Sequence, residues 1–332
     1  MNRNRALLLA LLGVLLLAVL MNLCLGASGL SPSEILSALG DTARESTAAR
    51  IFWYVRLPRT LAAILAGASL AAAGLLLQTV LRNPLAAPSV IGINSGAGLC
   101  ALICMAVFPG LSRLTSLAAF LGACAAAFAV YLLARLTGAS RATIVLAGVA
   151  VNSIFGACMD AIVTLIPEAV VSRSAFSIGG FSTTTMQQLR FAAPLCAMGF
   201  LTALVFGREL QLMALGDDVA HSLGLRVERF RALFLVAAAM LAGAAVSFAG
   251  LLSFVGLVAP HMTRILLKND AQLQLPIAAA FGAALCLICD LIARVAFAPF
   301  ELPVGIVLSI VGAPFFLYLL LIRKKRSRHD AT

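Results

Sequence analysis

Long uncharged apolar segments alternate with short polar connections along most of this chain. Between Thr60 and Leu81 there are 22 residues without a charged side chain. As a helix rising about 1.5 Å per residue, that segment is long enough to cross a hydrocarbon core of roughly 30 Å. The predicted crossings are 7–25, 60–81, 90–107, 115–134, 143–166, 191–206, 230–252, 255–267, 275–296 and 302–322. The pattern therefore predicts an all-α, polytopic membrane protein with about ten transmembrane helices, organised as one domain over residues 1–332.

The segment from Thr60 to Leu81 is also rich in small side chains. Alanine, glycine and serine fill most positions between Ala62 and Gly74, and small residues let the backbones of neighbouring membrane helices approach closely. The helix is expected to end before Asn83-Pro84, because proline cannot continue a helical hydrogen-bond ladder. We therefore expect this helix to pack against protein as well as lipid.

Composition and charge agree with a membrane protein and argue against nucleic-acid binding. The chain is 62% hydrophobic and 11% charged, whereas soluble domains are roughly 25% charged. The net charge of +11 comes from basic residues that lie between the apolar segments and at the two ends. An even number of crossings leaves both termini on one side, and a cytoplasmic assignment places most of the 24 basic residues inside, as the positive-inside rule expects.

The cysteines and histidines give no metal-binding pattern. All eight cysteines fall within apolar segments, where a free cysteine behaves as a small buried residue. Cys286 and Cys289 have C-x-x-C spacing but lack a second pair or a nearby histidine, and His221 and His261 each stand alone. No bound metal is expected. Outside the apolar segments, Ser31-Pro32-Ser33-Glu34 predicts the capped start of a short surface helix.

Two short motifs recur at one constant offset. Arg59-Thr-Leu and Leu85-Ala-Ala-Pro88 are matched by Arg231-Ala-Leu and Leu257-Val-Ala-Pro260. With ten crossings the first copy starts outside and the second inside, so the two halves would form an inverted repeat, as in many transporters. Chance similarity in a chain rich in alanine and leucine is the alternative.

The chain lacks the means to hydrolyse ATP by itself. It contains no G-x-x-x-x-G-K-[ST] sequence, and its only lysines, Lys268, Lys324 and Lys325, do not follow a glycine. A phosphate-cradling loop of the P-loop type is therefore absent. Ionisable side chains within the apolar segments, which an ion-coupled carrier would use, are few: Asp160, Asp290 and Arg294.

Asp290 and Arg294 stand four residues apart and should meet on one face of a helix. We interpret them as a structural ion pair, with a substrate site as the alternative.

Asp160 belongs to a polar stripe on an otherwise apolar segment, together with Asn152, Ser153 and Thr164. Such a stripe either lines a water-filled path or hydrogen-bonds to another helix, and we favour the path.

The largest loop on the cytoplasmic side of this arrangement runs over about 208–229 and includes LMALGDDVAHSLGL at 212–225. Gly216 precedes two acidic residues suited to a helix start, and Gly224 is suited to a helix end. The pattern predicts two very short helices with Leu and Met side chains on one side, which would fit a groove in another protein. A solvated loop is the alternative.

Five motifs together resemble one family of membrane transport proteins. They are RLPR at 56–59, NPLAAPSVIGINSGAG at 83–98, LGDDVAHSLGL at 215–225, FVGLVAPHMTR at 254–264 and ELPVGIVLSIVGAPFF at 301–316. In this order and over nearly the whole chain they resemble the FecCD family, the permease subunits of ABC importers for iron-siderophore, haem and cobalamin. Ala87 departs from the pattern, since many relatives carry an acidic residue there.

The resemblance implies a BtuC-like permease fold in a bacterial inner membrane, with both termini in the cytoplasm. It implies a second permease subunit, most simply as a homodimer, two cytoplasmic ATPase subunits and an extracytoplasmic substrate-binding protein. The chain itself would bind no cofactor, because ATP and Mg²⁺ would be used by the ATPase. It would be a transport subunit and not an enzyme, and a ferric siderophore would be its first candidate cargo, ahead of haem or cobalamin.

The resemblance also implies roles for particular residues. Arg56, Arg59 and Arg294 would dock the binding protein, and exposed arginines at the outer surface would suit pairing with its carboxylates. Coupling to the ATPase would use Leu212, Met213, Leu215, Gly216, Asp217, Asp218, His221, Leu223 and Gly224. The translocation pathway would include Ser140, Thr143, Asn152, Ser153, Asp160 and Thr164. The rival functions are a secondary transporter driven by an ion gradient and an intramembrane enzyme.

Overall fold

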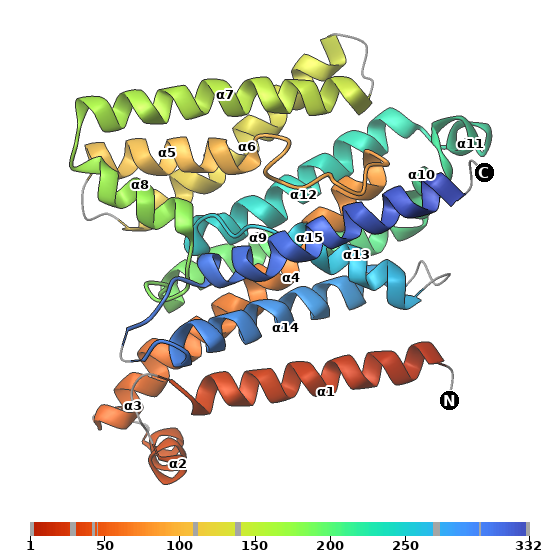
Figure 1. The fold of residues 1–332 in the computed structure, drawn as a ribbon. Helices are drawn as coiled ribbons and strands as arrows, with labels where there is room; N and C mark the ends of the chain where they lie inside the picture. The colour runs from red at the N-terminus through yellow and green to blue at the C-terminus, as the bar shows by residue number, and fades with distance from the viewer. Residues whose placement is uncertain are drawn as a thin grey trace.

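The computed structural model describes residues 3–26, 31–41, 44, 46–108, 112–136, 141–267, 273–298 and 300–329, and every regular element in them is helical (Figure 1). The elements are α1 Arg3–Cys24, α2 Pro32–Gly40, α3 Thr47–Ile51, the π-helical turn η1 Phe52–Arg56, α4 Leu57–Val80, α5 Ile93–Val107, α6 Ser112–Leu136, α7 Arg141–Leu165, α8 Ala169–Ile178, α9 Met186–Val205, α10 Gly207–Leu215, α11 Asp217–Ser222, α12 Val227–Ala249, α13 Val255–Leu267, α14 Gln274–Val295 and α15 Val304–His329. The predicted all-α fold is confirmed.

Each predicted apolar segment lies on one of these helices, but not all of the helices are long. Within the described part of the chain, seven helical segments are long and apolar enough to cross a membrane, whereas α5, α13 and Val304–Tyr318 of α15 are shorter apolar helices. The seven segments are Ala6–Cys24, Thr47–Val80, Leu114–Leu136, Thr143–Leu165, Met186–Val205, Val227–Ala249 and Gln274–Val295. The chain is therefore a multi-pass membrane protein.

The helices lie roughly along one direction and define two ends of the molecule (Figure 1). We call one the α2 end, where α2 and α3 lie, and the other the α11 end, where α10 and α11 lie. Both chain termini are at the α11 end (Figure 1). This placement agrees with an even number of crossings.

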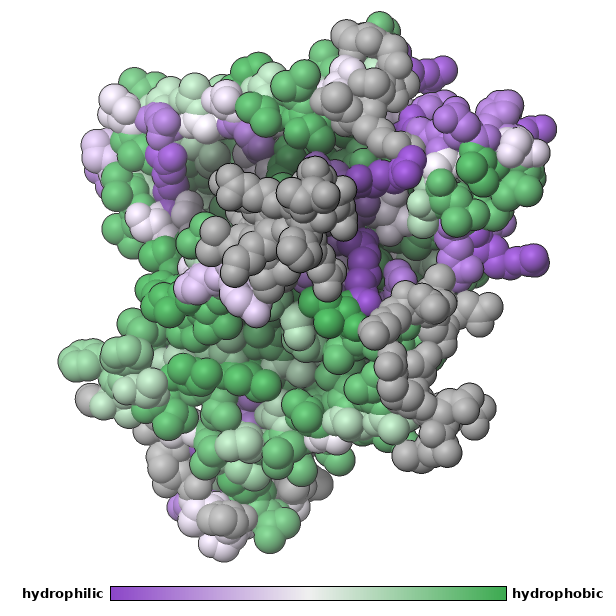
Figure 2. Space-filling view, turned by 45° about the vertical axis from the view of Figure 1, so that its right-hand side comes forward, coloured by the Kyte–Doolittle hydropathy of each residue, from purple (hydrophilic) through white to green (hydrophobic). Residues whose placement is uncertain are grey.

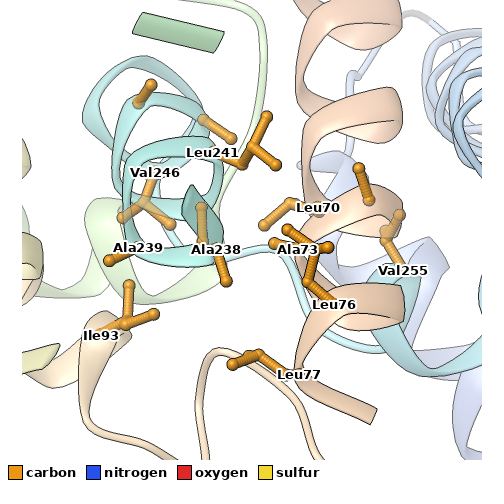
Figure 3. Packing of buried hydrophobic residues seen from close by; sticks show 14 of the residues in the cluster. Leu70, Ala73, Leu76, Leu77, Ile93, Ala238, Ala239, Leu241, Val246 and Val255 are labelled. Carbon is orange, nitrogen blue, oxygen red and sulfur yellow. The ribbon is translucent and has the colours of Figure 1, made fainter. Parts of the chain in front are cut away.

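The central helices α4 and α12 pack through leucine and alanine side chains. Leu70, Ala73 and Leu76 of α4 lie beside Ala238 and Leu241 of α12 in the buried core (Figure 3). On other faces of α4 the backbones themselves touch: a Cβ atom would lie 2.3 Å from the Gly282 carbonyl oxygen if added at Gly67, and 1.9 Å from the Gly256 carbonyl oxygen if added at Gly74. The close approach expected from the small residues of this helix is confirmed.

The helix contacts agree with the predicted inverted repeat. The helix α4 packs along α14, and α12, which the repeated motifs pair with α4, packs along α6. Helix α6 follows α4 and α5 in the chain as α14 follows α12 and α13. The two central helices start at opposite ends of the molecule, α4 after α3 and α12 after α11 (Figure 1). Arg59 and Arg231, which the repeat pairs, are both buried near the starts of their helices.

The predicted cap at Ser31 starts α2. The Ser31 backbone N–H donates to Glu34 Oε2 at 2.7 Å, and the Glu34 backbone N–H donates to Ser31 Oγ at 3.3 Å. This is the reciprocal arrangement of a capping box. The backbone and side-chain hydrogen bonds from Ser31 lower the pKa of the Glu34 carboxyl group.

The α4–α14 contact yields a direct stability prediction. Substituting Gly67→Leu places a side chain against the Gly282 carbonyl and should lower the free energy of unfolding by about 3 kcal/mol, because the two backbones must separate. Thermal unfolding of the purified chain in detergent measures the effect. Gly13→Leu is the control, since a Cβ atom there meets nothing within 4 Å. Equal thermal stability of the two variants would contradict the packing described here.

Candidate functional site

A buried cluster of charged side chains lies at the α2 end. Arg59, from the first turn of α4, donates from Nε to both carboxylate oxygens of Asp290 on α14 at 3.0 and 3.1 Å. Its Nη1 donates to Glu301 Oε2 at 2.6 Å, just before α15. Arg294 Nε lies 3.2 Å from Asp290 Oδ2, an oxygen that Arg59 Nε also contacts, so the predicted ion pair is confirmed. The Arg59–Asp290 pair therefore joins α4 to α14, and the Arg294–Asp290 pair lies within α14.

The remaining donors of the cluster bind the end of α1. Arg294 donates from Nη2 to Asn22 Oδ1 at 2.5 Å and from Nη1 to the Leu25 carbonyl at 3.2 Å. Arg56 Nη1 donates to the Leu23 and Cys24 carbonyls at 2.8 and 2.7 Å. Carbonyls in the last turn of a helix lack partners within the helix, and cationic groups stabilise them. The charged cluster thus joins α1, η1, α4, α14 and the segment before α15.

The expectation that the three arginines are exposed is wrong. Arg56, Arg59 and Arg294 are only 3%, 6% and 3% exposed. Each has partners that sequence reasoning missed, namely Glu301, Asn22 and the carbonyls at the end of α1. These partners draw the guanidinium groups inward, because a buried charge must be paired. Docking of a binding protein at these arginines remains a prediction.

At the α11 end, α10 and α11 form the two short helices that the sequence predicts. Gly216 separates them with φ +124°, a backbone conformation that favours glycine. The Arg82 guanidinium lies against this glycine, where a Cβ atom would be 3.0 Å from Nη1. Arg231, buried near the start of α12, donates from Nη2 to Asp217 Oδ2 at 2.8 Å and from Nη1 to Glu228. The Arg231–Asp217 pair fixes α11 against α12, a role for Asp217 that the sequence did not indicate, and the Arg231–Glu228 pair lies within α12.

The apolar side chains of this pair of helices point in two directions. Leu210 and Met213 are buried against the core, so Met213 seats α10 and is not part of the exposed surface predicted for it. Leu215, Val219 and Leu223 are 59%, 46% and 59% exposed. Figure 2 shows hydrophilic residues gathered at this end with apolar residues among them. An exposed apolar group rimmed by charge is typical of a protein-binding surface.

The polar stripe on α7 divides into a packed part and an open part. Asn152 accepts from Ser95 Oγ at 2.6 Å and donates to the Ser89 carbonyl at 2.8 Å, so it joins α7 to the start of α5. Ser153, Asp160 and Thr164 are exposed.

The structure adds an ion-pair partner to this stripe and describes one of the two residues predicted at its start. Asp160 pairs with Arg173 of α8 at 2.5 Å, a partner that its spacing did not reveal. Thr143 is half-buried, and Ser140 lies outside the described residues. The open part of the stripe gives α7 a polar face.

The chain matches one protein family over nearly all of its length. The model of the FecCD transport family matches residues 14–322. The Fe(3+)-citrate import system permease YfmD of Bacillus subtilis is 37% identical over 90% of this chain and 89% of that protein. The hemin transport system permease HmuU of Yersinia pestis is 36% identical over 94% of this chain and 95% of its own. The cobalamin import system permease BtuC of Halobacterium salinarum is 37% identical over 85% of this chain and 76% of that protein.

A solved structure shares the fold. It is described as an inward-facing conformation of a metal-chelate type ABC transporter, and it superimposes with a TM-score of 0.84 at 25% sequence identity. The match covers 96% of this chain and 99% of the solved one. The all-helical arrangement found here is therefore that of an ABC permease.

The charged cluster can be tested by comparing two aspartates. Asp290→Asn leaves Arg59 and Arg294 buried without a carboxylate between them and should lower the free energy of unfolding by about 3 kcal/mol or more. Asp160→Asn removes the same charge from a pair at the surface of the chain and should cost less than about 1 kcal/mol. Thermal unfolding of both variants in one detergent makes the comparison. A loss at Asp160 as large as that at Asp290 would contradict the buried-pair interpretation.

Proposed function

This chain belongs to the FecCD transport family, and from that premise we propose that it is the permease subunit that moves a ferric siderophore through a membrane by an ATP-driven import mechanism. It is a transport component and not an enzyme. Metal chelates as the cargo class are supported by its relatives, whose names include Fe(3+)-citrate, hemin and cobalamin. The high coverage of both chains by these matches is the observation that carries the proposal.

Among the chelates, a ferric siderophore is the cargo we favour. Iron chelates recur among the relatives, which include an achromobactin permease of Dickeya dadantii and an iron(3+)-hydroxamate permease of Bacillus subtilis. Haem would be expected to find an axial ligand such as His or Tyr along its path. The helix α7 contains neither residue. Haem and cobalamin remain the alternatives that a transport assay must include.

The energy for import would come from a partner bound at the α11 end. The chain has no phosphate-binding loop, so ATP and Mg²⁺ would act in two separate ATPase subunits. The exposed Leu215, Val219 and Leu223 would enter a groove on such a subunit, and the Asp217–Arg231 pair would hold this surface to α12. A closing motion of the ATPase would thereby reach one of the two central helices. This end would face the cytoplasm, together with both termini.

The cargo path would lie between two copies of the chain. Along α7, exposed apolar side chains such as Leu146, Val149 and Ile154 alternate with the open polar side chains of Ser153 and Asp160. A face with both kinds of side chain suits contact with a second subunit and a water-filled path beside it. Helix α15, with Ile310 and Val311 also exposed, would complete this face. We propose a homodimer as the simplest assembly.

A binding protein would deliver the cargo at the α2 end. Arg59 and Arg294 pair with the carboxylates of Asp290 and Glu301, and Arg56 donates to carbonyls at the end of α1 in the same cluster. The side chain of Glu301 is 34% exposed and marks the open side of this cluster. A carboxylate of the binding protein that reached Arg59 there would compete with Glu301. Such docking would act on the segment directly before α15.

Reconstituted transport tests the proposed function. The full-length chain is placed in liposomes with its ATPase and binding protein, and uptake of a ferric siderophore, haem and cobalamin is compared. We expect uptake of the ferric siderophore only when hydrolysable ATP is present on the ATPase side. A non-hydrolysable ATP analogue is the control for binding without turnover. Uptake by this chain alone under a proton gradient would contradict the proposal, and ATP-dependent uptake of only haem or cobalamin would reassign the cargo.

A further inference from the structure

A cavity of about 970 Å³ lies at the α11 end of the molecule. Its walls come from the last two turns of α4 and the segment directly after it, the end of α9, the length of α10, and the neighbouring ends of α13 and α14. Most of its polar side chains lie outside the coupling, docking and pathway roles discussed above. The cavity therefore needs an explanation of its own.

The polar side of this cavity is cationic. It is lined by the guanidinium groups of Arg82, Arg208 and Arg264 and by glutamine side chains, and none of the described lining residues is acidic. Arg264 is held in place because its Nη1 donates to Gln78 Oε1 at 2.9 Å, and Gln78 in turn donates to the Gly256 carbonyl at 3.0 Å. Gln78 is only 2% exposed. Part of the cationic wall is thus fixed before any ligand arrives.

The other side of the cavity is apolar. Leu75, Leu204 and Leu275 line it, and Leu204, on a helix long enough to cross the membrane, is 60% exposed. The cavity lies where several apolar helices end, which is the depth of lipid headgroups in a bilayer. A ligand that matches both walls carries an anion next to hydrocarbon.

We propose that this cavity binds the phosphate headgroup of an anionic phospholipid from the leaflet at the α11 end. Arginine pairs with phosphate oxygens through two parallel hydrogen bonds, and basic pockets between membrane helices are suited to anionic headgroups. Inorganic phosphate shares the headgroup chemistry, but it would leave the apolar wall uncovered. The leucines of that wall are the reason for choosing the lipid.

The bound lipid would also steady the surface proposed to meet the ATPase. Arg82 both lines the cavity and lies against Gly216, the residue between α10 and α11. Gln211 and Leu212 line the cavity from α10 itself. A headgroup bound to Arg82 and Arg208 therefore connects the end of α4 to α10. Lipid binding is measurable without transport, so its failure would leave the proposed function untouched.

Native mass spectrometry of the full-length chain with added lipid tests the proposal. We expect phosphatidylglycerol to bind more tightly than phosphatidylcholine with the same acyl chains. The double variant Arg82→Gln/Arg208→Gln should lose this binding by about tenfold or more, because two charges near the headgroup are removed. Gln211→Glu places a negative charge in the cavity with almost no change of shape, and it should also weaken the binding of phosphatidylglycerol.

The matched control is Arg135→Gln/Arg229→Gln, which removes two exposed positive charges outside the cavity lining. It should bind phosphatidylglycerol like the unmodified chain. Equal losses in the two double variants would overturn the proposal, because they would indicate general surface attraction. Unchanged binding in both cavity variants, or phosphatidylcholine binding as tightly as phosphatidylglycerol, would also overturn it. Displacement of the lipid by inorganic phosphate at equal concentration would overturn the lipid assignment and leave a soluble anion site.

Discussion

The close contact between α4 and α14 is the constraint on which the rest of the structure depends. Lipid tails are as apolar as leucine, so membrane helices gain little from the hydrophobic effect and rely on close packing and polar contacts. Gly67 and Gly282 provide the packing, with backbones so near that no Cβ atom fits between them. Arg59 lies two turns before Gly67 on α4, and Asp290 lies beyond Gly282 on α14. The close approach of the two helices brings these side chains within 3.0 Å of each other. One helix pair therefore sets both the core and the charged cluster.

The packed helices form the centre of the molecule, and the proposed functions lie at its two ends, the α2 end and the α11 end. At the α2 end, the charged cluster connects α1, α4 and α14 to the segment before α15. At the α11 end, Arg231 connects α11 to α12 in the same manner. Each central helix thus begins with a buried arginine that pairs with two carboxylates. In an importer, these are the places where partners on opposite sides of the membrane would act on one rigid centre.

The sequence predicts those features that depend on neighbours along the chain. Apolar segments located the helices, Gly216 and Gly224 bounded the short helices at the α11 end, and spacing of four residues paired Asp290 with Arg294. It could not predict partners brought together by the fold, such as Glu301, which is 242 residues from Arg59, or Arg173 beside Asp160. For the same reason it placed Arg56, Arg59 and Arg294 on the surface, since burial depends on contacts far away in the chain.

Cross-linking across the assembled transporter tests the central claim most directly, namely that α10 and α11 meet the ATPase and the opposite end does not. A cysteine is introduced at Val219 on α11 or at Leu36 on α2, both exposed in the structure, and each variant is treated with a short bifunctional reagent in membranes containing the partners. The account predicts a cross-link to the ATPase from Val219→Cys and none from Leu36→Cys. A cross-link to the ATPase from Leu36→Cys, with none from Val219→Cys, would contradict it.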